Sequence, residues 1–279
     1  MSEYQYKSWR PWHNPIGGPG DTTVYKLPKS EVEPIKFFDQ LAFVGTSQFG
    51  IFVLETSEGL IMIESGEPTR ECFNAITKGF DQLGYSLDDL KAVLVAHGHY
   101  DHFGCAGILR RLPNCKVYMT KDDYEYGSDI DFKRPEKTLM WEPDGYLDDG
   151  DEFVLGDTTV YCVHDKRNNY SGLSMIFKVT DSGKEHWAVL LGCTYTDTLN
   201  YDEYLASVEY VREKVNEFGC DVEIYSHGHM DSTRERLVVC RNIVNGVANP
   251  FVIGNDAVNR YLDWHEEIAI IQKKNGWKV

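Results

Sequence analysis

Leu94-Val95-Ala96-His97-Gly98-His99-Tyr100-Asp101-His102-Phe103-Gly104 is the most informative segment of the chain, because an apolar run ends here in three histidines and one aspartate. His97 and His99 stand two residues apart, so that on a strand or a tight turn both imidazoles point the same way. Asp101 and His102 follow on a turn, from which they can face a second nearby point. Imidazole nitrogen and carboxylate oxygen are ligands that suit Zn²⁺. The segment therefore predicts a metal site at the end of a strand.

The pattern His-X-His-X-Asp-His-X-Gly over residues 97–104 resembles the signature of the metallo-β-lactamase superfamily. The resemblance implies an α/β (α+β) protein, an αβ/βα four-layer sandwich that holds one or two metals at its rim. It also implies, as a rule, hydrolysis by a water or hydroxide that the metals hold. The same fold hosts lactamases, lactonases, thioesterases, nucleases and some redox enzymes, so the motif does not select a substrate.

The composition of the chain limits the classes of partner that the protein can bind. Its 279 residues, 42% of them apolar, can form one α/β unit with a sizeable core. The net charge of −16 argues against nucleic acid or an anionic membrane surface as a partner, because both need a basic face. No signal peptide and no membrane-spanning run is visible, and seven scattered cysteines indicate reduced thiols. We expect a cytoplasmic protein with a small-molecule substrate; a homo-oligomer stays open.

Hydrophobic periodicity divides the chain into an N-terminal aromatic arm, residues 1–35, and a single domain, residues 36–279. Strands are predicted at 41–45, 50–55, 60–64, 90–96, 117–120, 153–155, 158–163, 175–179, 187–191 and 222–226. Helices are predicted at 69–83, 107–112, 121–127, 201–217, 232–245 and 255–274. A loop of about 20 residues follows the helix at 121–127, and its length favours a functional role.

Aromatic side chains in two of these segments are candidates for the substrate pocket. In the arm, Trp9 and Trp12 either pack across the body of the protein or form a wall of the pocket. Tyr124, Tyr126, Phe132 and Trp141 of the segment 121–150 are further pocket candidates, and we single out Trp141.

The resemblance places further metal ligands at the ends of later strands. The predicted strand 222–226 ends at His227, where relatives carry their last metal histidine, and the run Ser226-His227-Gly228-His229-Met230-Asp231 resembles the corresponding loop of the third subclass of metallo-β-lactamases. His229 is the alternative ligand, or a group that touches the substrate. Cys193 stands where relatives carry an Asp, a Cys or a Ser, and is either a ligand or a small buried thiol.

The loop after residue 163 departs from the family pattern. A gapless match to relatives places their ligand histidine on Asn169, and amide oxygen is a poorer zinc ligand than imidazole. Three interpretations remain. His164 moves in to coordinate, or Asn169 binds weakly, or the His97–His99 position is half-empty and catalysis depends on Asp101, His102, Cys193 and His227.

These observations predict a zinc-dependent hydrolase, with one or two Zn²⁺, that acts through a metal-bound hydroxide on a small, partly apolar carbonyl substrate such as a cyclic amide, a lactone or a related ester. Asp101 is expected to bind one metal and to orient the nucleophile, while Tyr170 or Tyr195 donates a hydrogen bond to the developing oxyanion. The alternatives are an iron-dependent redox or lyase enzyme on the same fold, a β-lactamase proper, and a binding protein that has lost full metallation.

Overall fold

The structure of the protein is a computed structural model, and it describes residues 32–132, 141–165, 172–192, 200–228, 231–243 and 247–275. For residues 130–132 only the backbone is described. Trp9, Trp12, Asn169, Tyr170, Cys193, Tyr195 and His229, all named above as candidates, lie outside these residues.

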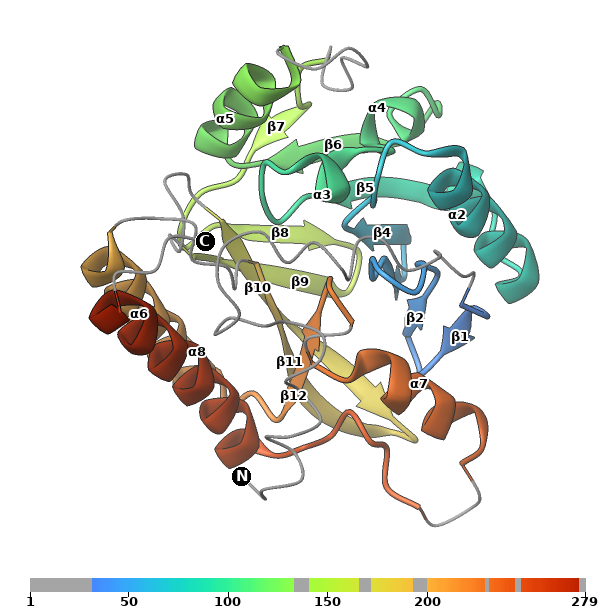
Figure 1. Ribbon diagram of the computed structural model, residues 1–279. Coiled ribbons are helices and arrows are strands. Elements are labelled where there is room, and N and C mark those ends of the chain that lie inside the picture. Colours follow the sequence, from blue (N-terminus) through green and yellow to red (C-terminus); the bar gives the residue numbers. More distant parts are fainter. Residues whose placement is uncertain are drawn as a thin grey trace.

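Two β-sheets form the centre of the molecule (Figure 1). The first has seven strands in chain order: β1 (Ile35–Lys36), β2 (Leu41–Phe43), β3 (Phe52–Thr56), β4 (Gly59–Ile63), β5 (Leu90–Leu94), β6 (Lys116–Met119) and β7 (Gly145–Tyr146). It is antiparallel as far as β4 and parallel from β4 to β7. The second has the order β12 (Val222–Tyr225), β11 (Lys184–Leu191), β10 (Leu173–Asp181), β9 (Thr158–His164) and β8 (Glu152–Leu155). Only β11 and β12 are parallel within it.

Helices cover the outer face of each sheet (Figure 1). The first sheet packs against α2 (Arg70–Leu83), α3 (Tyr100–Phe103), α4 (Ala106–Leu109) and α5 (Lys121–Phe132). The second packs against α6 (Tyr201–Phe218) and α8 (Asn255–Asn275). A third apolar core joins the inner faces of the two sheets, and α7 (Thr233–Arg241) contributes Leu237 to it. The order helix, sheet, sheet, helix confirms the predicted αβ/βα sandwich.

The sandwich explains why the central strands are apolar at nearly every position. In β3, Phe52 and Leu54 point into the core between the sheets, whereas Val53 points toward α2. Successive side chains of a strand point to opposite faces, and here both faces are covered, so both must be apolar. The strand β5 follows the same rule and delivers its last residues, fully buried, to the metal segment.

Helix α2 begins and ends where the sequence predicts. The Thr69 hydroxyl accepts a hydrogen bond from the Cys72 backbone N–H, and Gly84 ends the helix with a φ of 74°. A threonine N-cap and a left-handed glycine after the last turn are the usual boundary signals of a helix.

Several boundaries differ from the prediction. Helix α5 continues past Gly127 to Phe132, because a glycine inside a helix costs only about 1 kcal/mol and does not by itself end it. Asp101 and His102, predicted on a turn, lie in the single-turn helix α3. Strand β1 begins at Ile35, so the sheet already includes the last residue of the predicted arm.

Two further expectations concern the cysteines and the membrane. All six cysteines that the structure describes are free thiols, and five of them are buried, as predicted for small apolar side chains. Within the described ranges, no helix combines the length and apolar character needed to cross a membrane.

Candidate metal centre

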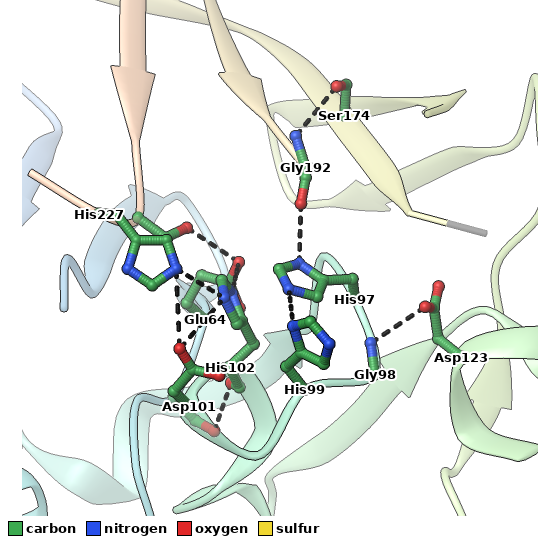
Figure 2. A network of polar contacts seen from close by, with 12 residues as sticks. Glu64, His97, Gly98, His99, Asp101, His102, Asp123, Ser174, Gly192 and His227 are labelled. Carbon is green, nitrogen blue, oxygen red and sulfur yellow. Dashed lines mark hydrogen bonds and ion pairs between the residues drawn. The ribbon is translucent and has the colours of Figure 1, made fainter. Parts of the chain in front are cut away.

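Five of the predicted ligands gather at one edge of the sandwich, where strands of both sheets end: His97, His99, Asp101, His102 and His227 (Figure 2). Glu64 follows β4 and His97 lies just beyond β5 in the first sheet, while Gly192 follows β11 and His227 lies just beyond β12 in the second. In each pair the two strands are parallel, so their carboxyl ends meet at the same edge. The Leu173 N–H donates to the Ala96 carbonyl over 2.7 Å and joins the two sheets at this point.

Asp101, His102 and His227 form one set of donor atoms. His102 Nε2 lies 3.3 Å from His227 Nε2, and Asp101 Oδ2 lies 3.8 Å from His102 Nε2 and 3.6 Å from His227 Nε2. A tetrahedral zinc site with bonds of about 2.0–2.1 Å separates its donor atoms by about 3.3–3.4 Å. Two neutral donors and one anionic donor at nearly this spacing fit a zinc ion.

Glu64 fixes the orientation of His102. The carboxylate Oε1 accepts a hydrogen bond from His102 Nδ1 at 2.8 Å, and both side chains are about 1% exposed. With Nδ1 occupied, the lone pair of Nε2 faces Asp101 and His227. A carboxylate behind a histidine is the usual support of a zinc ligand, because it selects the tautomer and raises the basicity of the ring.

The same carboxylate oxygen of Glu64 also binds the loop that carries the other histidine. The Ser226 hydroxyl donates to it over 3.0 Å, directly before His227 in the chain. Glu64 itself has a φ of 69°, a left-handed conformation that costs a side-chain-bearing residue roughly 1–2 kcal/mol. Strained residues of this kind concentrate at functional sites. Glu64 therefore links the two histidines of this set, because it contacts His102 directly and the loop of His227 through Ser226.

Shortening this side chain tests the connection. We expect Glu64→Asp to leave the fold intact and to weaken zinc binding by about 10- to 100-fold, the usual cost of losing a partner behind a ligand histidine. The aspartate is one methylene too short to reach His102 and Ser226 together. Zinc affinity by chelator competition measures the effect. Glu55→Asp, on the half-exposed end of β3, is the matched control and keeps the wild-type affinity.

His97 and His99 form a second set beside the first. His97 Nδ1 donates to the Gly192 carbonyl at 2.8 Å, which leaves His97 Nε2 facing His99 Nδ1 at 3.1 Å. The rings of His97 and His102 lie with centroids 3.6 Å apart, so the two sets adjoin. Two imidazoles supply only part of a zinc site, and a further ligand from a neighbouring segment completes it.

The electrostatics of the two sets differ. Burial, and then the neighbouring imidazoles of His102, His99 and His227, lower the pKa of His97 well below its usual value. His97 is therefore neutral at pH 7 and keeps a lone pair for a metal. Burial also lowers the pKa of His102, but the Glu64 and Asp101 carboxylates outweigh this effect, so that the net shift is upward. The negative charge of the same two carboxylates would stabilise a zinc dication bound by Asp101 and His102.

Asp123 of α5 holds the backbone between His97 and His99. Its Oδ1 accepts from the Gly98 N–H at 3.0 Å and its Oδ2 from the Thr120 hydroxyl at 2.5 Å. A side chain at residue 98 would come within 2.3 Å of the Asp123 carbonyl oxygen, so only glycine fits there. Burial raises the pKa of Asp123 to about 8, although both hydrogen bonds lower it.

Two described candidates lie apart from these sets. His164, at the end of β9, places Nε2 3.0 Å from a carboxylate oxygen of Asp148, and it is not in either group of clustered metal donors among the described residues. This geometry does not support the interpretation in which His164 moves in to coordinate. Trp141 packs over Gly107 of α4 and against the core under the first sheet.

Aromatic side chains next to the histidines extend the site. Phe49 meets the His227 ring edge-on, with centroids 5.5 Å apart, and Tyr126 of α5 lies 5.8 Å from the His99 ring. The sequence marks Tyr126 as a pocket candidate through its long aromatic segment. Nothing in the sequence marks Phe49 or Asp123, because the contacts of both arise only when distant segments fold together.

Comparisons with known proteins agree with this geometry. Residues 51–175 match the family model described as "Metallo-beta-lactamase superfamily". A curated relative, "Probable polyketide biosynthesis zinc-dependent hydrolase PksB" of Bacillus subtilis (strain 168), is 24% identical over 129 residues. That match covers 46% of this chain and 53% of the relative, so it spans about half the length of either protein. The name of this relative describes a zinc-dependent hydrolase.

Solved structures extend the likeness over most of the chain. BJP-1, a subclass B3 metallo-beta-lactamase of Bradyrhizobium japonicum, has a TM-score of 0.74 and 21% identity over 88% of this chain and 95% of its own. The FEZ-1 metallo-beta-lactamase from Legionella gormanii has a TM-score of 0.75 and 21% identity over 89% of this chain and 98% of its own. At such identities the likeness establishes the fold. The family model of the metallo-β-lactamase superfamily thus matches residues 51–175, and the fold of the chain is similar to that of the subclass B3 enzymes.

Proposed function

We propose that the protein is a zinc-dependent hydrolase of a small, partly apolar carbonyl compound such as a cyclic amide, a lactone or a related ester. The observation that carries the proposal is the triangle of Asp101 Oδ2, His102 Nε2 and His227 Nε2, whose edges of 3.3, 3.6 and 3.8 Å suit a zinc ion. The Glu64 carboxylate behind His102 supports the same assignment, because it fixes the nitrogen that would face the metal.

Zinc, when bound, lowers the pKa of a water ligand from 15.7 toward about 7 and polarises the carbonyl group of a substrate. Asp101, His102 and His227 would hold one ion, and His97 and His99 would hold part of a second. Asp101 carries the negative charge of its set and lies 10% exposed at the edge of the site, where it can accept a proton or a hydrogen bond from the attacking water.

Further groups complete the proposal. Asn169 or Cys193 would supply the remaining ligand of the His97–His99 position, and His229 would lie beside His227. Tyr170 or Tyr195 would donate a hydrogen bond to the developing oxyanion. Phe49 and Tyr126, in contact with His227 and His99, provide apolar surface for the substrate, and Trp9 and Trp12 would extend it, whereas Trp141 packs against the core.

A substrate panel with the zinc-loaded protein tests the proposal. We expect turnover of lactones, cyclic amides or aryl esters that stops on addition of a chelator and returns with zinc. A protein that hydrolyses β-lactams faster than every other substrate would be a β-lactamase proper, and the broader substrate class would be wrong. Iron with visible absorbance in the purified protein, together with no hydrolysis, would replace the proposal with a redox or lyase enzyme.

A further inference from the structure

A chain of buried hydrogen bonds leads from His97 into the protein interior, away from the metal-facing side of its ring. Nδ1 of His97 donates to the Gly192 carbonyl at 2.8 Å, and the Gly192 N–H donates to the Ser174 hydroxyl at 3.0 Å. Ser174 in turn donates to Oδ2 of Asp165 at 2.6 Å. In Figure 2, dashed lines join Ser174 to Gly192, Gly192 to His97, and His97 to His99. Asp165 and Ser174 are both fully buried, and no role in the metal site follows for either of them from the sequence.

The Asp165 carboxylate fixes the direction of each hydrogen bond in this series. A carboxylate only accepts, so the single hydroxyl proton of Ser174 goes to Asp165. The lone pairs of the same hydroxyl are then left for the Gly192 N–H. With its N–H held in this way, Gly192 presents its carbonyl to His97, which must carry its proton on Nδ1 and keep Nε2 unprotonated.

Gly192 itself offers no alternative means of support. A side chain at residue 192 would come within 2.1 Å of the Leu173 carbonyl oxygen, so the position accepts only glycine. Glycine has no side chain that could fix its own backbone, and its conformational freedom must be removed by neighbours. The hydrogen bond from its N–H to Ser174 supplies this restraint.

Asp165 also closes the base of the loop in which the family's ligand histidine is replaced. The Asp165 N–H donates to the Gly172 carbonyl at 2.8 Å, and the Gly172 N–H donates back to the Asp165 carbonyl at 3.2 Å. Residues 166–171, which include Asn169, lie between these two points. The Ser207 hydroxyl of α6 donates to the other carboxylate oxygen, Oδ1, at 3.4 Å. One buried carboxylate thus joins β9, β10 and α6 directly behind His97.

We propose that Asp165 and Ser174 are positioning residues of the His97–His99 metal position. They hold Gly192 so that its carbonyl selects the Nδ1–H tautomer of His97. This inference deepens the proposed function and rests on zinc binding at His97 and His99. The two residues would act on the metal position through Gly192.

Ser174→Ala tests the proposal, because it removes the hydroxyl and adds no bulk. We expect the zinc affinity of the His97–His99 position to fall by about 10- to 100-fold, while the Asp101–His102–His227 position keeps its affinity. Zinc binding is followed by chelator competition, and His99→Ala identifies which binding step belongs to the His97–His99 position. Asp165→Asn keeps an acceptor for Ser174 and is expected to have a smaller effect.

Ser207→Ala is the matched control, since it removes a hydroxyl from the same carboxylate on the side away from Gly192. It should leave both zinc affinities unchanged. Two outcomes would contradict the proposal, because each would mean general loosening of the core. In the first, Ser207→Ala loses as much zinc affinity as Ser174→Ala. In the second, Ser174→Ala loses zinc affinity equally at both metal positions. Thermal unfolding establishes that each variant is folded.

A second readout separates this inference from the proposed function. Long-range proton–nitrogen NMR of the metal-free protein reports which nitrogen of His97 is protonated. We expect Nδ1–H in the wild type and in Ser207→Ala, and a mixture of tautomers in Ser174→Ala. An unchanged Nδ1–H signal in Ser174→Ala would contradict the positioning role. The two proposals can also fail separately. If the wild type binds no zinc while Ser174→Ala still changes the tautomer of His97, the zinc-dependent function is contradicted and the positioning of His97 by Ser174 stands.

Discussion

Asp101→Asn should abolish hydrolysis almost completely while the protein remains folded. The substitution keeps the shape of the side chain but removes the only anionic donor of the Asp101–His102–His227 set. An amide oxygen is a weak zinc ligand beside a carboxylate. We expect a fall in kcat/KM on the order of 1000-fold, equivalent to about 4 kcal/mol of lost transition-state stabilisation. Steady-state kinetics at saturating zinc measure it, and metal analysis of the same sample shows whether the ion is lost.

Asp221→Asn is the matched control for this prediction. Asp221 also accepts from a histidine, His186, at 2.5 Å, but His186 lies near the start of β11, six residues before Gly192 at the site. Six residues of strand span about 20 Å. The control should keep wild-type activity. Full activity in Asp101→Asn would show that the set is not the catalytic metal position.

The second large effect is expected from Gly98→Ala. A Cβ at residue 98 would lie 2.3 Å from the carbonyl oxygen of Asp123 and 3.2 Å from its Cα, both of them backbone atoms that cannot turn aside. The loop must move away, so the hydrogen bond from Gly98 to Asp123 breaks and His97 and His99 separate. We expect the free energy of unfolding to fall by about 1–3 kcal/mol, the usual cost of overpacking, and zinc at this position to be lost.

Gly228→Ala, next to His227, is the matched control for Gly98→Ala. A Cβ at residue 228 would meet only side-chain atoms, the nearest being Thr233 Cβ at 3.3 Å. This variant should therefore keep nearly all of its stability and its zinc. Chemical unfolding and metal analysis of both variants decide the matter. Equal loss in the two variants would show that any side chain near a ligand is harmful, and that the fit of Gly98 against Asp123 is not special.

The metal segment could be predicted from the sequence because its chemistry is local. His97, His99, Asp101 and His102 lie within six residues, and an apolar strand leads directly into them. The resemblance carried by this motif also led to the sandwich and to His227. The helix boundaries at Thr69 and Gly84 were equally local, since a cap depends on a few neighbouring residues.

The resemblance pointed to Glu64, because relatives carry an acidic residue at the end of this strand that supports the metal loop, but the individual contacts behind the ligands could not be predicted in the same way. Glu64 is separated from Ser226 by 162 positions and His97 from Gly192 by 95, and no periodicity links residues so far apart. Asp123 resembles any acidic residue at a helix start until its contact with Gly98 is seen. The loop with Asn169 departs from the family pattern, and neither local chemistry nor resemblance identifies the ligand that replaces the missing histidine.

The number of zinc ions per chain tests the central claim most directly. Elemental analysis is made on the wild type and on Asn169→His, which restores the histidine of the family pattern. We predict at least one zinc in the wild type, bound through Asp101, His102 and His227, and two in Asn169→His. Two zincs already in the wild type would mean that Asn169 or Cys193 completes the His97–His99 position. Iron, or no metal in either protein, would contradict the assignment of a zinc-dependent hydrolase.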